Sequence, residues 1–318
     1  MRISTLFFCG LLCYTSLTYG QTPKLFGEGV ISTPFREWTT TFTPDGKTVY
    51  FSQGASRYAI VYSENQNGHW QKPKLASFSG LWYDTDPFIS LDGQRLYFCS
   101  NRPADQDPAA KPDKNFHIWM VQKTGNTTWS SPVCLDTPIN LPGVNSWYPS
   151  ESMDGHFYFH SWNRPGGHGY NDIYASIRNG NTFSPPTLLP FDTAGYNSQE
   201  ARISGDDEYM LFVSNRPGGL GVSDLYISFH KDKEWSKPQN LGPAINTPGI
   251  ANMAPALSID GSILYFTNNS GPHPANTKKL ADYDELLKEM NGVYNGLWNI
   301  YYVPLNIPDL RAKAVWER

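Results

Sequence analysis

Cysteine is nearly absent from this sequence, so disulfide bonds cannot be the main framework of its fold. Four cysteines occur in 318 residues, whereas disulfide scaffolds are short and dense in cysteine. Cys9 and Cys13 fall within the first 20 residues, which leaves Cys99 and Cys134 farther along the chain.

An excess of basic residues is also missing. The chain has 25 Lys and Arg against 29 Asp and Glu, which gives a net charge of −4. Surfaces that bind nucleic acid or anionic membranes carry clusters of positive charge. We therefore predict no nucleic-acid partner.

Long apolar runs are missing except near the start of the chain. The run over residues 6–12 follows a basic residue and is too short to span a bilayer. Thr18 and Gly20 stand at the −3 and −1 positions of a cut before Gln21. We predict a signal peptide over residues 1–20, export to the periplasm or the exterior, and no membrane-spanning segment.

Helix signals are scarce in the rest of the chain, and a strand pattern recurs five times instead. Each unit has an extended run, an Asp-Gly or similar turn, and a strand rich in aromatic and branched residues. A third strand and a proline-containing edge strand follow. The turn aspartates recur about 50 residues apart, which is typical of propeller blades; they are Asp45, Asp92, Asp154, Asp206 and Asp260.

These repeats predict one all-β domain over residues 21–318. We expect a single five-bladed β-propeller of four-stranded antiparallel blades, with blades near 37–78, 83–140, 147–192, 198–246 and 252–304.

The fifth unit lacks its own fourth strand. The segment TPKLFGEGVISTPF near the start is like SKPQNLGPAINTPG from Ser236, an outer strand and its exit. We predict that residues 23–31 pair beside the strand at residues 299–303. Such a closure stops the first and last blades from separating.

The predicted strand order also gives positions for the two remaining cysteines. Cys99 falls in the second strand of blade two and Cys134 in the fourth, about 9–10 Å apart by strand spacing. A disulfide needs Cα atoms within about 7 Å. Both thiols should therefore be free.

Several stretches resemble the TolB-like propellers, the Pro-Asp-repeat relatives of the WD-repeat family. The similar stretches are TPDGKTVYF from Thr43, SLDGQRLYFCSNRP from Ser90, WNRPGGHGYNDIYAS from Trp162 and SNRPGGLGVSDLYIS from Ser214. The resemblance covers nearly the whole chain after residue 20 and implies a propeller of the bacterial envelope. Relatives often carry six or seven blades, whereas this chain has five repeats. Such propellers serve as scaffolds, binding modules and enzyme domains.

Residues that break the repeat are the candidates for function, because residues found in every unit serve the fold. The starts of the innermost strands line the mouth of the channel, where ligands of propellers tend to bind. Aromatic rings beside carboxylates can stack sugar rings and bond their hydroxyls; alternatively, they pack blade against blade. The predicted ligand-binding set is Trp82, Tyr83, Asp86, Trp147, Tyr148, Glu200 and Arg202.

A catalytic site is the weaker alternative. Asp86, Glu151 and Glu200 could supply the acid and the base or nucleophile of a glycoside hydrolase. His160 or Tyr148 could act as the base of a lyase. The sequence has no nucleophile elbow, phosphate-binding loop or dinucleotide fingerprint in the right context, and we expect no cofactor.

Two further expectations concern blades three and five. His156, His160 and His168 lie in one blade, but strand alternation and the hairpin should scatter them, so we predict no metal site. The insert over residues 272–297 contains LADYDELLKEM, whose apolar residues have helical spacing. We expect this helix to cap the mouth.

The sequence thus predicts an exported, monomeric, non-catalytic propeller that binds a glycan or an envelope protein. Two alternatives stay open. One is a glycan-active enzyme, either a glycoside hydrolase or a polysaccharide lyase, and the other is a scaffold subunit of an envelope complex.

Overall fold

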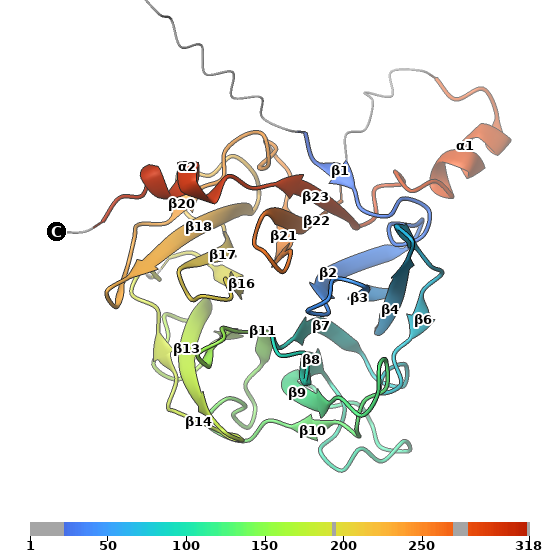
Figure 1. Ribbon diagram of the computed structural model, residues 1–318. Helices are drawn as coiled ribbons and strands as arrows, with labels where there is room; N and C mark the ends of the chain where they lie inside the picture. Colours follow the sequence, from blue (N-terminus) through green and yellow to red (C-terminus); the bar gives the residue numbers. More distant parts are fainter. Residues whose placement is uncertain (1–21, 193–194, 270–278, 317–318) are drawn as a thin grey trace, which may run out of the picture.

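The strands of the chain form five sheets arranged around one axis (Figure 1). The computed structural model describes residues 22–192, 195–269 and 279–316. The predicted five-bladed propeller is confirmed. The predicted signal peptide, residues 1–20, lies outside the described residues.

Each blade runs from an innermost strand at the channel outward to a short edge strand. In blades one, three and four the edge is split into two short strands that both pair with the third strand. Blade one holds β2 (Arg36–Phe42), β3 (Thr48–Gly54), β4 (Tyr58–Gln66), β5 (His69–Trp70) and β6 (Lys74–Leu75); blade two holds β7 (Asp84–Ile89), β8 (Arg95–Ser100), β9 (His117–Gln122) and β10 (Val133–Cys134); blade three holds β11 (Ser146–Glu151), β12 (His156–Trp162), β13 (Asn171–Asn179), β14 (Thr182–Phe183) and β15 (Thr187–Leu188); blade four holds β16 (Ser198–Ile203), β17 (Tyr209–Ser214), β18 (Asp224–Lys231), β19 (Glu234–Trp235) and β20 (Gln239–Asn240); blade five holds β21 (Asn252–Leu257), β22 (Ile263–Asn268), β23 (Asn299–Pro304) and β1 (Lys24–Leu25).

The predicted closure by the N-terminal strand is also confirmed. In the pairing of β1 with β23, Lys24 lies opposite Tyr302 and Leu25 opposite Tyr301. Phe26 then inserts its ring between the last and first blades, 4.9 Å from Tyr265 and 5.6 Å from Trp70 between ring centroids. The closing segment is therefore held by apolar packing as well as by strand pairing.

The hairpin between the innermost and second strands uses the same chemistry in each blade. A Ser or Thr hydroxyl donates to the turn aspartate, as Ser204 does to Asp206 at 2.6 Å. The next residue has a left-handed backbone, which favours glycine. It is Gly46, Gly93, Gly155 and Gly261 in four blades, and Asp207 (φ 60°) in blade four.

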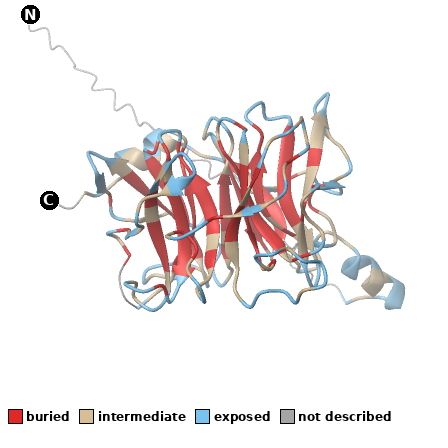
Figure 2. Ribbon diagram, turned by 90° about the horizontal axis from the view of Figure 1, so that it is seen from below, coloured by how far each residue is buried: buried red, intermediate tan, exposed pale blue. Residues whose placement is uncertain are grey.

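Apolar side chains fill the spaces between adjacent blades. Buried residues occupy the middle of the strands, and exposed loops lie at both ends of the ring (Figure 2). Cys99 and Cys134 are both free, as predicted, because β9 lies between their strands.

In the described part of the chain, two helices lie outside this core. Helix α1 (Tyr283–Met290) forms within the insert of blade five, but Figures 1 and 2 place it beyond the outer edge of the ring. It has no buried residue and does not cap the channel as expected. Helix α2 (Ile307–Ala312) packs Ile307 and Leu310 against the apolar cluster of blades four and five. Within the described residues, no helix has the length and apolar character needed to cross a membrane.

Candidate binding site at the mouth of the channel

Each innermost strand carries a β-bulge at the same place. The pairing register shifts there in all five blades, and one residue of each bulge has a left-handed backbone. A bulge re-aims the side chains around it, and a left-handed conformation costs a residue other than glycine about 1–3 kcal/mol. The five bulge residues are Thr39, Asp86, Tyr148, Glu200 and Ala254, with φ between 42° and 55°.

In three of these bulges, the backbone N–H group donates a hydrogen bond to the preceding blade. In each case a side chain of the second strand there accepts the bond: Asp86 N–H donates to Ser52 Oγ (3.2 Å), Tyr148 N–H to Cys99 Sγ (3.2 Å) and Glu200 N–H to His160 Nδ1 (3.1 Å). The backbone feature repeats while the side chains do not. The ring of bulges can therefore present different chemistry from each blade on one fixed frame.

A cavity of about 470 Å³ opens where the innermost strands begin. We call it the mouth pocket. Five of its lining residues are aromatic, and among them Trp162 has 55% of its surface exposed. The lining is Trp38, Tyr58, Tyr83, Thr85, Asp86, Asn145, Trp147, His160, Trp162, Asn171 and Glu200.

Ring contacts hold most of the aromatic rim in place. Trp147 stacks on Phe116 with ring centroids 4.1 Å apart, and Tyr83 meets the same ring edge-on at 5.2 Å. Trp38 packs edge-on against Trp298 at 5.0 Å. Because these rings are fixed before a ligand arrives, binding to them would cost little side-chain ordering.

Asp86 is one of the buried lining residues, which we call the floor of the pocket, and is only 5% exposed. Its Oδ1 accepts a hydrogen bond from Thr39 Oγ1 of the neighbouring blade at 2.9 Å. Burial raises the pKa of Asp86 to about 6. At neutral pH this group is therefore mostly an anionic acceptor.

Glu200 also belongs to the floor and is only 7% exposed. Its Oε2 accepts a bond from the Ala254 N–H of blade five at 2.6 Å. Burial, reinforced by the negative charge of Asp86, raises the pKa of Glu200 to about 8. At neutral pH the group is mostly a neutral carboxylic acid, which can donate a hydrogen bond.

His160 is also neutral. Its Nδ1 accepts the Glu200 N–H, so its proton lies on Nε2. Burial lowers the pKa of His160 to about 3. The floor therefore combines an anionic acceptor, a neutral acid and a neutral imidazole below an aromatic rim.

The structure brings together four of the seven predicted ligand-binding residues. Tyr83, Asp86, Trp147 and Glu200 line the mouth pocket. Trp82 is buried beside β7 and lies outside this lining.

Tyr148 and Arg202 lie in the interior of the channel. Tyr148 is fully buried, and its hydroxyl donates to the Pro255 carbonyl of blade five at 2.8 Å. The Arg202 guanidinium lies 5.2 Å from the Tyr148 ring centre and 4.7 Å from that of Phe88. Both residues join blades across the channel.

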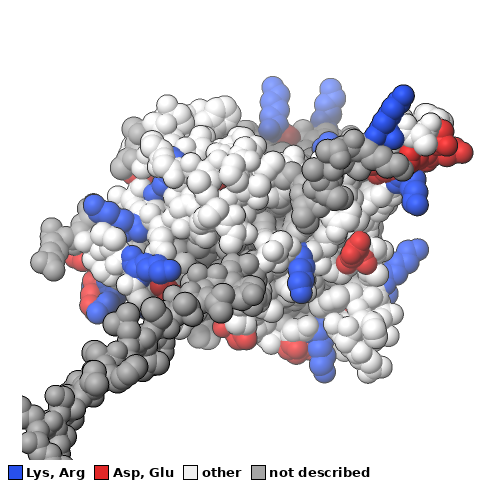
Figure 3. Space-filling model, turned by 90° about the horizontal axis from the view of Figure 1, so that it is seen from above, with Lys and Arg blue, Asp and Glu red and all other residues white. Residues whose placement is uncertain are grey.

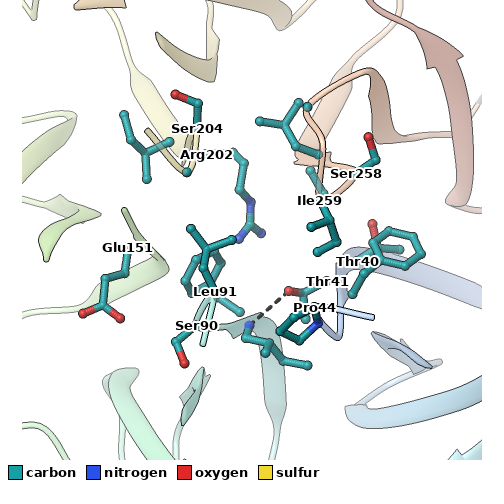
Figure 4. Close-up of a pocket in the computed structure, with 18 of the residues that line it drawn as sticks. Thr40, Thr41, Pro44, Ser90, Leu91, Glu151, Arg202, Ser204, Ser258 and Ile259 are labelled. Atoms are coloured by element: carbon teal, nitrogen blue, oxygen red, sulfur yellow. Dashed lines mark hydrogen bonds between the residues drawn. The ribbon is translucent and has the colours of Figure 1, made fainter. Parts of the chain in front are cut away.

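Glu151 lies at the opposite end of the channel, beside a second cavity of about 60 Å³ that we call the rear cavity. Figure 4 shows Arg202 pointing into this cavity while the Glu151 carboxylate is turned away from it. Glu151 is nearly fully buried and forms ion pairs with Arg178 and, at 3.5 Å, with Arg95. These pairs tie it to its neighbours and place it apart from Asp86 and Glu200.

The histidines of blade three are separated, as the strand pattern suggests. His160 lies at the mouth pocket, while His168 Nδ1 lies 3.1 Å from Asp172 Oδ1 of the same loop. His156 lies at the hairpin turn beside Asp154.

Sequence reasoning missed Tyr58 and Trp162 in the pocket lining. A signal for Trp162 is present in the sequence. Blades two and four run directly from Ser to Asn-Arg-Pro, at Ser100 and Ser214, whereas blade three inserts Trp162 between Ser161 and Asn163. An inserted aromatic residue at the mouth end of a strand is a departure from the repeat.

No protein-family model matches the sequence, and no curated protein matches it. Several solved structures share its fold. A protein of Agrobacterium tumefaciens assigned as TolB is 16% identical with a TM-score of 0.50, over 86% of this chain and 92% of that one. A thermostable family-43 glycoside hydrolase is 13% identical with a TM-score of 0.54, over 88% and 93%.

An α-L-arabinofuranosidase from Lactobacillus brevis is 12% identical with a TM-score of 0.50, over 87% of this chain and 91% of that one. At identities this low, the structural similarity shows a common propeller fold and nothing more, because a fold by itself does not determine function.

Proposed function

We propose that this chain is an exported TolB-like propeller that binds a glycan in the mouth pocket without cleaving it. The observation that carries the proposal is the aromatic rim of the pocket above a floor of buried hydrogen-bonding groups. The repeat motifs that resemble TolB-like propellers and the predicted signal peptide support a place in the periplasm or outside the cell.

The chemistry of the pocket suits a sugar. A pyranose ring presents an apolar C–H face to an aromatic ring and hydroxyls around its edge. Trp147 and Trp162 can take the face, while Asp86 accepts and Glu200 donates hydrogen bonds at the floor. The volume of about 470 Å³ is in the range of small-ligand sites.

A glycan fits better than a protein partner or a scaffold role. A stable protein interface buries at least about 1,000 Å² of broad surface, whereas the candidate site is concave. Figure 3 shows one side of the ring, seen edge-on, where Lys, Arg, Asp and Glu side chains are scattered over a mostly uncharged surface. The described part of this side shows no strongly charged patch for steering a partner.

Binding fits better than cleavage because both floor carboxyls already serve the fold. A glycoside hydrolase needs an acid and an ionised carboxylate that flank the scissile bond. Here Asp86 and Glu200 are nearly buried, and each accepts a hydrogen bond from an adjacent blade, Asp86 from Thr39 of blade one and Glu200 from Ala254 of blade five. Glycan cleavage remains the alternative that the experiment below can reveal.

The proposal predicts that Trp162→Ala weakens glycan binding. We would titrate the chain from residue 22 onward with a panel of oligosaccharides by calorimetry and continue with the tightest ligand. Loss of a stacking ring should weaken binding by at least about ten-fold, which is about 1.4 kcal/mol. The melting temperature should change little, because Trp162 is 55% exposed.

The matched control is Tyr283→Ala, which removes an exposed aromatic residue on α1, away from the pocket. Equal affinities of both variants for the ligand would contradict the proposed site. Mass spectrometry of the oligosaccharide after long incubation should show intact ligand. Shorter products that disappear with Glu200→Gln would establish the hydrolase alternative instead.

A further inference from the structure

Two histidines and two aspartates converge at the end of the ring opposite the mouth pocket. Asp154 and His156 belong to the inner hairpin of blade three, Asp207 to the inner hairpin of blade four, and His230 to β18. His156 Nδ1 lies 3.1 Å from Asp154 Oδ2 and 3.0 Å from Asp207 Oδ2. His230 Nδ1 lies 3.0 Å from the same Asp207 oxygen.

Asp207 occupies a position that the turn itself would give to glycine. Its φ is 60°, and glycine stands at this place in the other four blades. A non-glycine residue there carries a conformational cost of about 1 kcal/mol. The turn does not need this carboxylate, since Asp206 already accepts the Ser204 hydroxyl as in the other blades.

The Asp207 carboxylate is also oriented from outside the cluster. The Tyr158 hydroxyl donates to Asp207 Oδ1 at 2.8 Å, and the residue is only 6% exposed. This bond fixes the carboxylate and leaves Oδ2 facing the two imidazoles. Among the described residues, the ion-pair partners of Asp207 are histidines, whose positive charge depends on protonation.

Although the sequence predicted no metal site from the histidines of blade three, we propose that Asp154, His156 and Asp207 bind a divalent cation of the zinc class, with Asp154 Oδ2, His156 Nδ1 and Asp207 Oδ2 as ligands. The three ligand atoms lie within 4.8 Å of one another. Bonds of about 2.0–2.2 Å in a tetrahedral zinc site place ligand atoms about 3.3 Å apart, which small side-chain shifts would reach from the spacing seen here. A mixed imidazole and carboxylate set favours zinc over Mg²⁺ or Ca²⁺, which take oxygen ligands.

His230 would contact the ligand Asp207 and would not bind the cation itself. Its Nδ1 lies 3.1 Å from the Asp207 carbonyl and 3.0 Å from Asp207 Oδ2, and its ring stacks on Trp235 at 4.6 Å. An N–H at this nitrogen would orient the ligating carboxylate, as outer-shell donors do in metal sites. The ligands come from two blades, so the cation would join blade three to blade four.

The test uses the metal itself on the chain from residue 22 onward after treatment with a chelator. Calorimetric titration with ZnCl₂ should show one zinc ion bound per chain, and the melting temperature should rise with zinc concentration, since a ligand that binds only the folded state stabilises it. MgCl₂ and CaCl₂ should not reproduce this at the same concentrations.

Asp207→Gly is the most informative variant, because glycine is the residue that the other blades use at this turn. It should fold, and it should weaken zinc binding by at least about ten-fold. His156→Asn should do the same, while His69→Ala, which removes an exposed histidine on blade one, should not. A far-UV circular dichroism spectrum of each variant checks that it is folded.

Two results would overturn the proposal. One is that the wild-type chain binds no zinc at stoichiometric concentrations, in which case the cluster is only a network of hydrogen bonds between blades. The other is zinc binding that survives in both Asp207→Gly and His156→Asn, which would place the ion elsewhere.

Discussion

Glu200 joins two blades of the propeller and also lines the proposed ligand site. Its carboxyl accepts the Ala254 N–H of the next blade, and burial holds it in the neutral form. An acid that is neutral at physiological pH can donate to a sugar hydroxyl, which an ionised carboxylate cannot.

This state of Glu200 predicts a pH dependence of stability. The pKa rises from 4.5 to about 8 on folding, so above pH 4.5 the unfolded chain releases a proton that the folded chain keeps. The free energy of unfolding should therefore fall as pH rises from 4.5 towards 8. Asp86 acts in the same direction, but only up to about pH 6.

Glu200→Gln removes this contribution while keeping an oxygen that can accept the Ala254 N–H. Denaturant unfolding of both proteins between pH 6 and 8 should show a steeper loss of stability for the wild type. Parallel curves over this range would mean that Glu200 is ionised in the folded protein.

The residues at the mouth could be predicted only in part, and the bulges are the physical reason. Strict alternation along β11 assigns Trp147 and Tyr148 to opposite faces but does not say which enters the channel. The extra residue of each bulge shifts the register at this point. As a result Trp147 lines the pocket and Tyr148 joins the blades. Glu151 is the last residue of β11 and therefore lies at the other end of the channel, where it pairs with Arg178.

At the scale of elements, the sequence was most informative about β1. A fifth repeat without its edge strand, together with a spare edge-like strand at residues 23–31, predicts the closure that β1 and β23 make. The helix of the insert was different. Its apolar spacing predicts α1 correctly, but a helical pattern does not specify what the helix packs against, and α1 lies outside the ring.

The closure predicts a large effect of Phe26→Ala. Phe26 is buried between blades one and five, against Phe42, Trp70 and Tyr265. Its truncation should reduce the free energy of unfolding by about 3–5 kcal/mol, measured by denaturant titration. Phe35→Ala is the matched control, because Phe35 is 59% exposed, and it should change the stability by about 0.5 kcal/mol or less. Similar losses for both variants would show that Phe26 does not hold the ring closed.

At the scale of the whole molecule, the propeller separates two kinds of chemistry along its axis. The mouth pocket gathers aromatic and polar groups from blades one to four, while the hairpin turns at the opposite end carry the histidine and aspartate cluster. The similarity to the TolB structure and to the family-43 glycoside hydrolase is a similarity of fold alone. What the propeller binds must therefore depend on the side chains at each end of the channel.

The central claim, glycan binding at the mouth, is tested most directly by oxidative footprinting of aromatic side chains with mass spectrometry. With the tightest oligosaccharide bound, oxidation of Trp162 and Trp147 should fall severalfold, while Tyr283 on α1 should be oxidised as before. Protection of Tyr283 with no change at Trp162 would contradict the account and place the ligand on the outside of the ring.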